Sequence, residues 1–358
     1  MSPEQQVSTA VSDAEAFLAH ATRIASRTDG ALDAFLAREA ALRGDLGVHV
    51  SLVTGAVDRL ARRGGKRLRP ALTAAAYLGL GGDDVARIDG AFVALELLQV
   101  YFLIHDDWMD QDDVRRGGPT VHVHLRRCFG DTAAGDAAAI LAGDLACATA
   151  QGALATVLRG ASERAEAASV LARMQSDVVL GQIRDMRSDA LTAAEVERTY
   201  ALKTGSYTVD GPLVLGAVLA GATPADVAPL RAFAAPLGVA FQMADDLLGT
   251  FGEGEVTGKP IHGDLRQGKR TCLVVELAAR AKDDPAARAR LEAIGKGSPE
   301  ELREVADYMQ ASGVRSTVEG RLADLLSEAR ARLVDVPVRA DMRSVLAGAI
   351  KALGARAA

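Results

Sequence analysis

Aromatic residues are scarce in this chain of 358 residues: they make up 4% of it, although 49% of all residues are hydrophobic. Alanine and leucine are abundant, and there are only 11 prolines. Alanine and leucine favour helices, whereas strands prefer aromatic and β-branched side chains. The composition therefore predicts an all-α protein with enough apolar side chains to bury a substantial core.

Cysteine is also scarce, and the chain lacks an excess of basic charge and long apolar runs. The three cysteines (Cys128, Cys147 and Cys272) form no CxxC pair, which excludes a disulfide framework and fits free thiols in a reducing compartment. With 41 basic and 47 acidic residues, the chain carries no field that would attract nucleic acid. The longest uncharged apolar stretch, near 212–222, is about half the length that spans a bilayer. We therefore expect a cytoplasmic protein without a membrane span or a nucleic-acid partner.

Helical periodicity recurs along the whole chain, and no long linker interrupts it. Glycine- and proline-bearing stretches at 115–119, 221–224 and 252–263 separate the helical segments. The expected helices cover 10–43, 48–63, 70–77, 85–109, 133–158, 162–187, 193–220, 224–248, 270–281, 286–295, 299–311, 314–332 and 338–353. A single helical domain over residues 1–358 is the simplest interpretation.

The stretch LIHDDWMDQDDVRRGGPT, at 103–120, carries the strongest chemical signal. On a helix, Asp106 and Asp110 share one face, and Asp107 lies about 100° round. Two carboxylates stacked one turn apart repel each other unless a cation lies between them, and hard oxygen ligands suit Mg²⁺. An exposed acidic helix end is the alternative, but negative charge at a helix C-terminus costs about 0.3–1 kcal/mol.

Two basic clusters contain adjacent glycines. Arg115 and Arg116 precede Gly117-Gly118, and RRGGKRLRP occupies 62–70. Arginine forks match phosphate oxygens, and glycines let a loop approach an anion closely. Either cluster alone also fits a solvated turn. A further acidic pair, Asp245-Asp246 in FQMADDLLG, echoes the first, which predicts two helices that present carboxylates towards one place.

Four motifs together resemble the trans-isoprenyl diphosphate synthases, in the order and at the spacing of that family. They are GGKRLRP at 64–70, DDWMDQDDVRRGGP at 106–119, KT at 203–204 and FQMADDLLGTFGEGEVTGKPIHGDLRQGK at 241–269. The resemblance implies an all-α homodimer with a central cavity and three Mg²⁺ ions per site. It also implies head-to-tail condensation of isopentenyl diphosphate with an allylic diphosphate, which is dimethylallyl, geranyl or farnesyl diphosphate.

The resemblance assigns a role to each matching residue. The metal ligands would be Asp106, Asp107, Asp110, Asp245 and Asp246. The allylic diphosphate would be held by Arg115, Lys203 and Lys259. Isopentenyl diphosphate would be held by Lys66, Arg69, Gln99 and Arg116. Thr204 and Gln242 would lie beside the reacting allylic carbon. One position departs from the family: the second motif ends in Gly249 instead of aspartate, which removes one group near the third metal.

Product length is predicted from Tyr101 and Phe102, about one helical turn before Asp106. Aromatic rings there would form a floor that limits the product to C15, with C20 as the alternative. Asp112 and Asp113 are expected to be bystanders. Two other functions are weighed: a class I terpene cyclase, and a non-catalytic subunit of a heteromeric synthase. The cyclase leaves the basic cluster at 64–70 without a task, and the intact first motif argues against the subunit.

Overall fold

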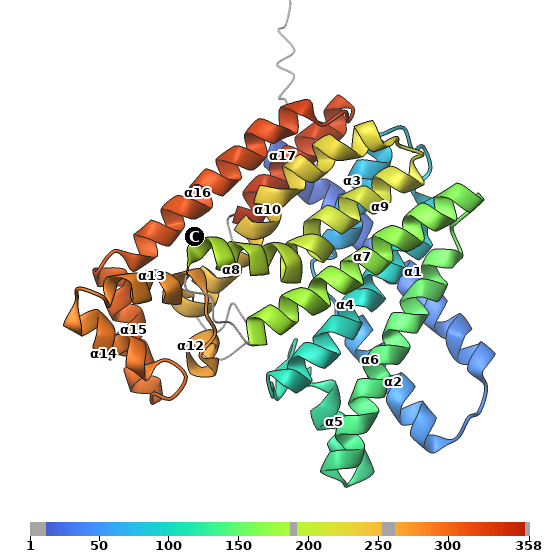
Figure 1. Cartoon of the computed structure of the whole chain (residues 1–358). Coiled ribbons are helices and arrows are strands. Elements are labelled where there is room, and N and C mark those ends of the chain that lie inside the picture. The colour runs from blue at the N-terminus through green and yellow to red at the C-terminus, as the bar shows by residue number, and fades with distance from the viewer. Residues whose placement is uncertain (1–11, 187–191, 253–261, 355–358) are drawn as a thin grey trace, which may run out of the picture.

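The computed structural model describes residues 12–186, 192–252 and 262–354 and is almost entirely helical in these ranges (Figure 1). This confirms the all-α prediction. The helices are α1 Asp13–Arg43, α2 Val48–Arg62, α3 Leu68–Gly79, η1 Val85–Ile88, α4 Asp89–Met109, α5 Val121–Phe129, α6 Thr132–Ala155, α7 Ala161–Met186, α8 Ala193–Tyr200, η2 Ala201–Asp210, α9 Gly211–Leu219, α10 Pro224–Phe251, α12 Gly263–Gln267, α13 Cys272–Arg280, α14 Pro285–Ala293, α15 Pro299–Ala311, α16 Val314–Arg332, η3 Leu333–Asp335 and α17 Ala340–Gly354. The two short strands are β1 Val114–Arg115 and β2 Gly118–Pro119.

Several helices begin where the sequence offers a capping box. Ser12 caps α1 with Glu15, Thr192 caps α8 with Glu195, and Ser298 caps α15 with Glu301. In each box the cap side chain accepts a backbone N–H, and the glutamate accepts the backbone N–H of the cap residue in return. The helix boundaries therefore follow local hydrogen-bonding chemistry.

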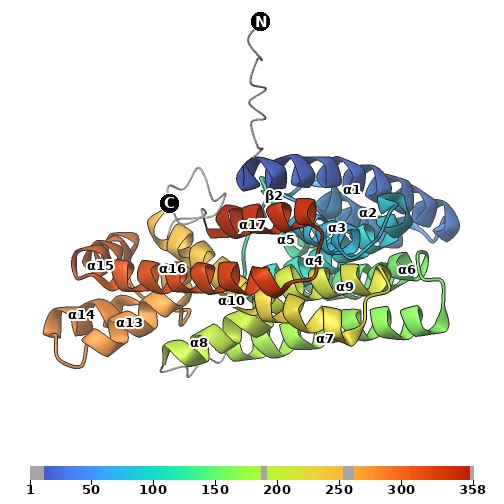
Figure 2. The ribbon, with the colours of Figure 1, turned by 90° about the horizontal axis from the view of Figure 1, so that it is seen from above.

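The helices stack in layers around α4 and α10. Figure 2 shows α1 and α2 on one side and α7 on the other, with α4 and α10 between them. The main hydrophobic core draws on residues from Phe17 in α1 to Leu353 in α17, and a second cluster joins α8, α10 and α13 to α16. The central pair α4 and α10 is thus held from both sides. That residues 1–358 form one domain stays a prediction.

Several features of the fold were not expected from the sequence, among them the short helix α12. The single helix expected at 193–220 is divided into α8, the π-helical segment η2 and α9. Helix α5 and the antiparallel pair β1–β2 fall in a region for which no element was expected. A π-helical turn carries an extra residue, so it changes which side chains share a face, and such turns often occur at functional sites.

Glycines let η2 lie close to both of its neighbours. A Cβ added at Gly181 of α7 would lie 2.3 Å from the backbone nitrogen of Lys203, and one added at Gly238 of α10 would lie 2.6 Å from Cα of Gly205. Both distances are too short for any side chain. The two backbone crossings bring Lys203 and its neighbours in η2 next to polar side chains of α7 and α10.

Three helices (Val85–Met109, Thr132–Ala155 and Pro224–Phe251) are long and apolar enough to cross a membrane by length and composition. The longest uncharged stretch, near 212–222, is therefore a poor measure of whether a segment could cross a membrane. The three helices carry isolated charges that interrupt their apolar runs. Inside the protein, 61% of the apolar window of the first and of the third is buried. The absence of a membrane span stays a prediction.

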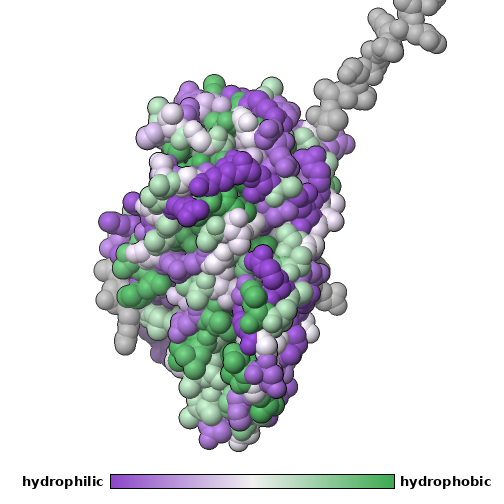
Figure 3. Space-filling model, turned by 90° about the vertical axis from the view of Figure 1, so that its right-hand side faces the viewer, coloured by the Kyte–Doolittle hydropathy of each residue, from purple (hydrophilic) through white to green (hydrophobic). Residues whose placement is uncertain are grey.

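Large exposed apolar side chains gather in two places. One is the α1–α2 connection, where Leu42, Leu46 and Val48 are 62–74% exposed. Figure 3 shows the face of the molecule that is on the right in Figure 1. In the lower half of this face, hydrophobic residues gather among hydrophilic ones. The other place is formed by α6 and α7, where Leu141 is 63% and Leu180 is 52% exposed.

Candidate active site

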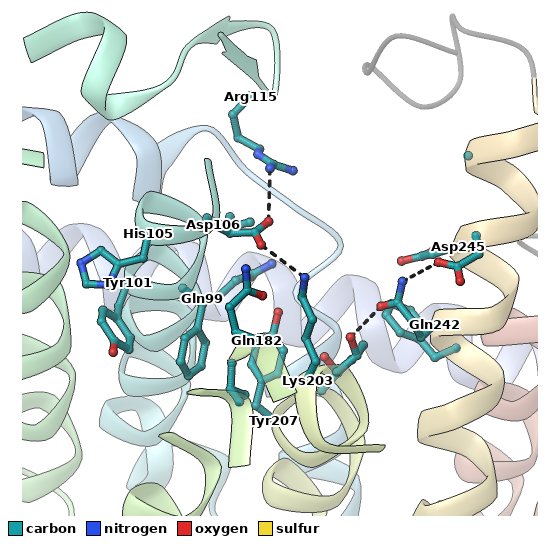
Figure 4. Close-up of a pocket in the computed structure, with 18 of the residues that line it drawn as sticks. Gln99, Tyr101, His105, Asp106, Arg115, Gln182, Lys203, Tyr207, Gln242 and Asp245 are labelled. Atoms are coloured by element: carbon teal, nitrogen blue, oxygen red, sulfur yellow. Dashed lines mark hydrogen bonds and ion pairs between the residues drawn. The ribbon is translucent and has the colours of Figure 1, made fainter. Parts of the chain in front are cut away.

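A cavity of about 870 Å³ lies between α4, α7, η2 and α10. Figure 4 shows Asp106 and Asp245 on opposite sides of it, with Lys203 between them. Most of the predicted site residues line it, although they come from distant parts of the chain: Lys66, Arg69, Gln99, Tyr101, Phe102, Asp106, Arg115, Arg116, Lys203, Thr204, Gln242, Asp245 and Asp246. Asp107 and Asp110 adjoin this set, and Lys259 lies outside the described residues.

The carboxylates at the end of α4 are paired with two lysines. Nζ of Lys203 lies 3.4 Å from Oδ1 of Asp106, and Nζ of Lys269 lies 2.7 Å from Oδ2 of Asp110. Burial raises the pKa of Asp110 and the neighbouring Asp106 raises it further, whereas Lys269 opposes both. In this structure the two carboxylates are thus paired with lysine side chains, and their binding of Mg²⁺ stays a prediction. Lys269 had been noted in the motif but had been given no role.

Asp107 lies deeper than its neighbours. Its side chain is fully buried, and Oδ1 accepts a hydrogen bond from Nε of Arg115 at 2.7 Å. Asp112 joins the same cluster, since its Oδ2 lies 3.5 Å from Nη2 of Arg115. That Asp112 is a bystander in the chemistry stays a prediction, although its carboxylate contacts a predicted site residue. Burial alone lowers the pKa of Arg115, but Asp107, Asp106 and Asp112 raise it by more, so this guanidinium stays charged beside the cavity.

Lys203 also contacts a carboxylate of α7 that sequence reasoning missed. Its Nζ lies 2.6 Å from Oδ2 of Asp185. Burial lowers the pKa of Lys203, but the charges of Asp106 and Asp185 outweigh this effect and raise it well above the ordinary value. No sequence pattern indicates Asp185, because its position depends on the backbone crossing at Gly181.

The basic residues near the α2–α3 connection form a second group on the cavity wall. Arg69 is 7% exposed, donates from Nη2 to Oγ1 of Thr208 at 2.9 Å, and lies 4.2 Å above the ring of Tyr207. Its buried Nε has no hydrogen-bond partner among the described residues. Arg116 donates to the carbonyl of Gly64 and has a positive φ of 50°. Guanidinium groups with spare donors in a buried position form an anion site.

Arg67, between Lys66 and Arg69, turns away from this group. It is 4% exposed and pairs with the buried Glu96, and its Nη2 lies 2.8 Å from Oδ1 of Asp29. Burial lowers the pKa of Arg67, but Glu96 and Asp29 raise it by more. Its φ of 43° lies in the left-handed region, which is uncommon for a side chain of this size. Arg67 therefore fixes the loop that presents Lys66 and Arg69.

The second aspartate motif lies on α10, opposite the first. Asp245 and Asp246 both line the cavity, and Asp246 is only 4% exposed. Oγ1 of Thr204 donates to Oε1 of Gln242 at 2.6 Å, so the two side chains predicted beside the reacting carbon are in direct contact. A Cβ added at Gly249 would lie 3.3 Å from Oδ2 of Asp264, so a carboxylate from α12 lies beside the position where the motif lacks one.

Three aromatic residues, Tyr101, Phe102 and Tyr207, line the cavity, and Figure 4 shows Tyr101 and Tyr207 below Asp106. The ring centroids of Tyr101 and Phe102 are 4.8 Å apart, and Phe102 lies 4.9 Å from Tyr207 in an edge-to-face arrangement. The two predicted floor residues are therefore in place, and Tyr207 from η2 is a third that sequence reasoning missed.

Comparison with known proteins gives the same family. The profile described as Polyprenyl synthetase matches residues 50–311. This chain belongs to the polyprenyl synthetase family. A geranylgeranyl diphosphate synthase of Sulfolobus acidocaldarius is 38% identical over 260 residues, 69% of this chain and 73% of that protein. A (2E,6E)-farnesyl diphosphate synthase of Mycobacterium tuberculosis is 34% identical over 276 residues, 70% of this chain and 68% of that protein.

A solved structure shows the same fold. The geranylgeranyl pyrophosphate synthase of Corynebacterium glutamicum, complexed with isoprenyl diphosphate and magnesium, matches with a TM-score of 0.87 at 31% identity. The match covers 93% of this chain and 99% of that one. As a member of the polyprenyl synthetase family, the chain is a prenyltransferase and a short-chain prenyl diphosphate synthase. The names of its relatives differ in product length, so they do not assign one to this chain.

The carboxylates that line the cavity of this polyprenyl synthetase fit Mg²⁺ ions that are coordinated by the protein and by a bound diphosphate together. The donors are hard carboxylate oxygens, Asp106 and Asp110 on one side and Asp245 on the other. Within the described residues, no group of three or more His, Cys, Asp or Glu side chains is close enough to enclose an ion alone. Mg²⁺ commonly uses one or two carboxylates together with substrate phosphates, so two facing sets of carboxylates match its needs.

Proposed function

We propose that this enzyme condenses isopentenyl diphosphate with dimethylallyl and geranyl diphosphate to give farnesyl diphosphate (C15), with geranylgeranyl diphosphate (C20) as the alternative product. The observation that carries the proposal is the arrangement of one cavity. At one end of the cavity, carboxylates lie close to lysine and arginine side chains. A separate group of basic residues lines the wall, and aromatic rings lie below.

The allylic diphosphate would bind between the two aspartate motifs. Bound Mg²⁺, held by Asp106 and Asp110 on one side and Asp245 on the other, would neutralise the diphosphate and so promote ionisation of the allylic C–O bond. Lys203 stays an ammonium ion because the surrounding carboxylates raise its pKa. Lys203 and Lys269 would exchange their carboxylate partners for diphosphate oxygens, and Lys259 keeps its predicted role on the same group. Three metal ions per site stay a proposal.

Isopentenyl diphosphate would bind at the separate basic group on the wall. Lys66, Arg69 and Arg116 line the cavity there, and Gln99 lies on the neighbouring face of α4. The buried Nε of Arg69 and the fixed guanidinium of Arg116 suit the oxygens of a second diphosphate. Two separate anion sites on one cavity place the double bond of one substrate near the allylic carbon of the other, which is the main requirement of a condensation.

The hydrocarbon chain would grow towards the aromatic rings. Phe102 contacts both Tyr101 and Tyr207, so the three rings present a continuous apolar surface about one helical turn from Asp106. Rings this near the reacting end leave limited length for the product, which favours C15. The apolar lining also excludes water, which would otherwise capture the carbocation.

We also propose a cytoplasmic homodimer that pairs through α6 and α7. Leu141 of α6 and Leu180 of α7 are more than half exposed, and so are Ile183 and Met186. Ile183 and Met186 also line the cavity, so a second copy on this face would close its wall against water. The three cysteines are unpaired, as expected of a reducing compartment.

The experiment is incubation of the pure protein with isopentenyl diphosphate, Mg²⁺ and one of three primers: dimethylallyl, geranyl or farnesyl diphosphate. Formation of farnesyl diphosphate from geranyl diphosphate, with no extension of farnesyl diphosphate, is the expected result, measured by mass spectrometry. Extension of farnesyl diphosphate would instead assign C20. Hydrocarbon made from farnesyl diphosphate alone would identify a cyclase, and no turnover with any primer would identify a non-catalytic subunit.

A further inference from the structure

A chain of hydrogen bonds leads from the buried interior to the reacting face of the cavity. The backbone N–H of Cys272 donates to the hydroxyl of Tyr200 at 2.9 Å, and that hydroxyl donates to Oδ2 of Asp246. Nε2 of Gln242 donates to Oδ1 of Asp246 at 2.8 Å, and Oγ1 of Thr204 donates to Oε1 of Gln242 at 2.6 Å. The chain thus joins α13, α8, α10 and η2.

The direction of each bond follows from the groups at its ends. A backbone N–H only donates, so it occupies the oxygen of Tyr200 and leaves the hydroxyl hydrogen for Asp246. A carboxylate only accepts, so the amide of Gln242 turns its NH₂ towards Asp246 and its oxygen towards Thr204. The hydroxyl hydrogen of Thr204 is therefore used, and the lone pairs of its oxygen are left for the cavity.

Asp246 lines the cavity, but its carboxyl oxygens are engaged in this chain. It is 4% exposed, and both of its oxygens accept a hydrogen bond from a protein side chain. The adjacent Asp245 also lines the cavity but is only partly buried. The two neighbours in the motif thus occupy different surroundings, although the resemblance assigned metal binding to both.

We propose that Asp246 is a positioning residue which, supported by Tyr200, fixes the amide of Gln242 and thereby turns the oxygen of Thr204 towards the developing allylic cation. This rests on the proposed function and deepens it. An oxygen dipole fixed in advance stabilises positive charge without reorganising during the reaction. In this arrangement Asp246 and Tyr200 would act through Gln242 and Thr204 and not by direct contact with a substrate.

The decisive variant is Asp246→Asn, compared with Asp245→Asn one residue earlier on the same helix. The new amide would present a donor to Gln242, which would flip and reverse the hydroxyl of Thr204. We expect kcat to fall about 10- to 100-fold, the effect of losing a hydrogen bond to a charged group, while KM for both diphosphates changes little. Binding of Mn²⁺ with inorganic diphosphate, followed by electron paramagnetic resonance, should match the wild type. Asp245→Asn should weaken that binding.

Tyr200→Phe tests the same chain from its far end and serves if Asp246→Asn does not fold. It should lower kcat in the same direction, and the double variant Tyr200→Phe with Asp246→Asn should lose little more than Asp246→Asn alone, because both act through one path. Weak Mn²⁺ binding in Asp246→Asn would show that Asp246 is a metal ligand and overturn the proposal. Unchanged kcat in either variant would overturn it as well. A wild-type protein without prenyl transfer would instead refute the proposed function.

Discussion

The ammonium group of Lys269 lies 2.7 Å from Oδ2 of Asp110, although 159 residues separate the two in the chain. Lys203 makes a corresponding contact with Asp106. In both pairs the carboxylate is a proposed metal ligand and the lysine a proposed diphosphate ligand. Binding of metal and diphosphate together therefore replaces two ion pairs within the protein by contacts with the ligands.

Replacing Lys269 by glutamine should weaken the allylic site selectively. We expect KM for geranyl diphosphate to rise about 10-fold, in line with the loss of a charge-assisted hydrogen bond, and KM for isopentenyl diphosphate to change much less. Steady-state kinetics measures both. Lys282→Gln, at an exposed position outside the cavity, is the control and should behave as wild type. An equal rise in both KM values would contradict the assignment of Lys269.

Removing the charge of Asp110 should change how stability depends on pH. Burial and Asp106 raise the pKa of Asp110 in the folded state. The folded protein therefore binds more protons than the unfolded chain just above the ordinary aspartate pKa, and stability falls as pH rises through that range. Without Mg²⁺, the wild type should lose more thermal stability than Asp110→Asn between about pH 4 and 7. Addition of Mg²⁺ and diphosphate should favour the wild type. Parallel curves for the two proteins would contradict the prediction.

The aromatic floor predicts longer products when it is reduced. Tyr101→Ala with Phe102→Ala should shift the product from C15 towards C20 and beyond, and Tyr207→Ala should add to the shift because its ring contacts Phe102. Chromatography of the dephosphorylated products measures the distribution. Phe92→Leu, at a fully buried position on the same helix and away from the cavity, should lower stability without changing the product. An unchanged product in the double variant would show that these rings do not set length.

Replacing Gly249 by the aspartate of the family motif should make the thermal stability of the protein depend more strongly on bound metal. The new side chain would start 3.3 Å from Oδ2 of Asp264, so the two carboxylates would repel each other. We expect Gly249→Asp to unfold at a lower temperature than wild type in a chelator, by about 1–2 °C for each kcal/mol of repulsion in a chain of this length, and to gain more from Mg²⁺ with diphosphate. Gly249→Asn keeps the shape and removes the charge. Equal melting temperatures for the two variants would exclude repulsion by Asp264.

Charged substitutions on α6 and α7 should separate the proposed dimer. Leu141→Asp with Leu180→Asp changes two exposed residues that do not line the cavity, so a loss of self-association should be measurable in a folded protein. Sedimentation analysis should show a dimer for the wild type and a monomer for the variant. Leu18→Asp, on an exposed position of α1, controls for added surface charge. A wild-type monomer would refute the proposed interface.

The motifs and their spacing predicted site residues whose type and order indicate a role. They missed residues whose position in the site depends on how the helices cross. Asp106, Arg115 and Lys203 were found because their types and order are characteristic of diphosphate chemistry. Asp185 and Tyr207 were missed, because their positions depend on the contact at Gly181 and on the π-helical turn of η2. Neither a backbone crossing nor a π-helical turn leaves a clear hydrophobic pattern in one sequence.

The backbone crossings at Gly181 and Gly205–Gly238 also affect the order in which the structure forms during synthesis of the chain. The cavity needs α4, α7, η2 and α10 together with Lys269, so it exists only when more than the first 260 residues are in place. Contacts so distant in sequence form late in folding. A nascent chain on the ribosome therefore has complete helices long before the cavity can form. In refolding, the return of helical circular dichroism should precede the return of activity.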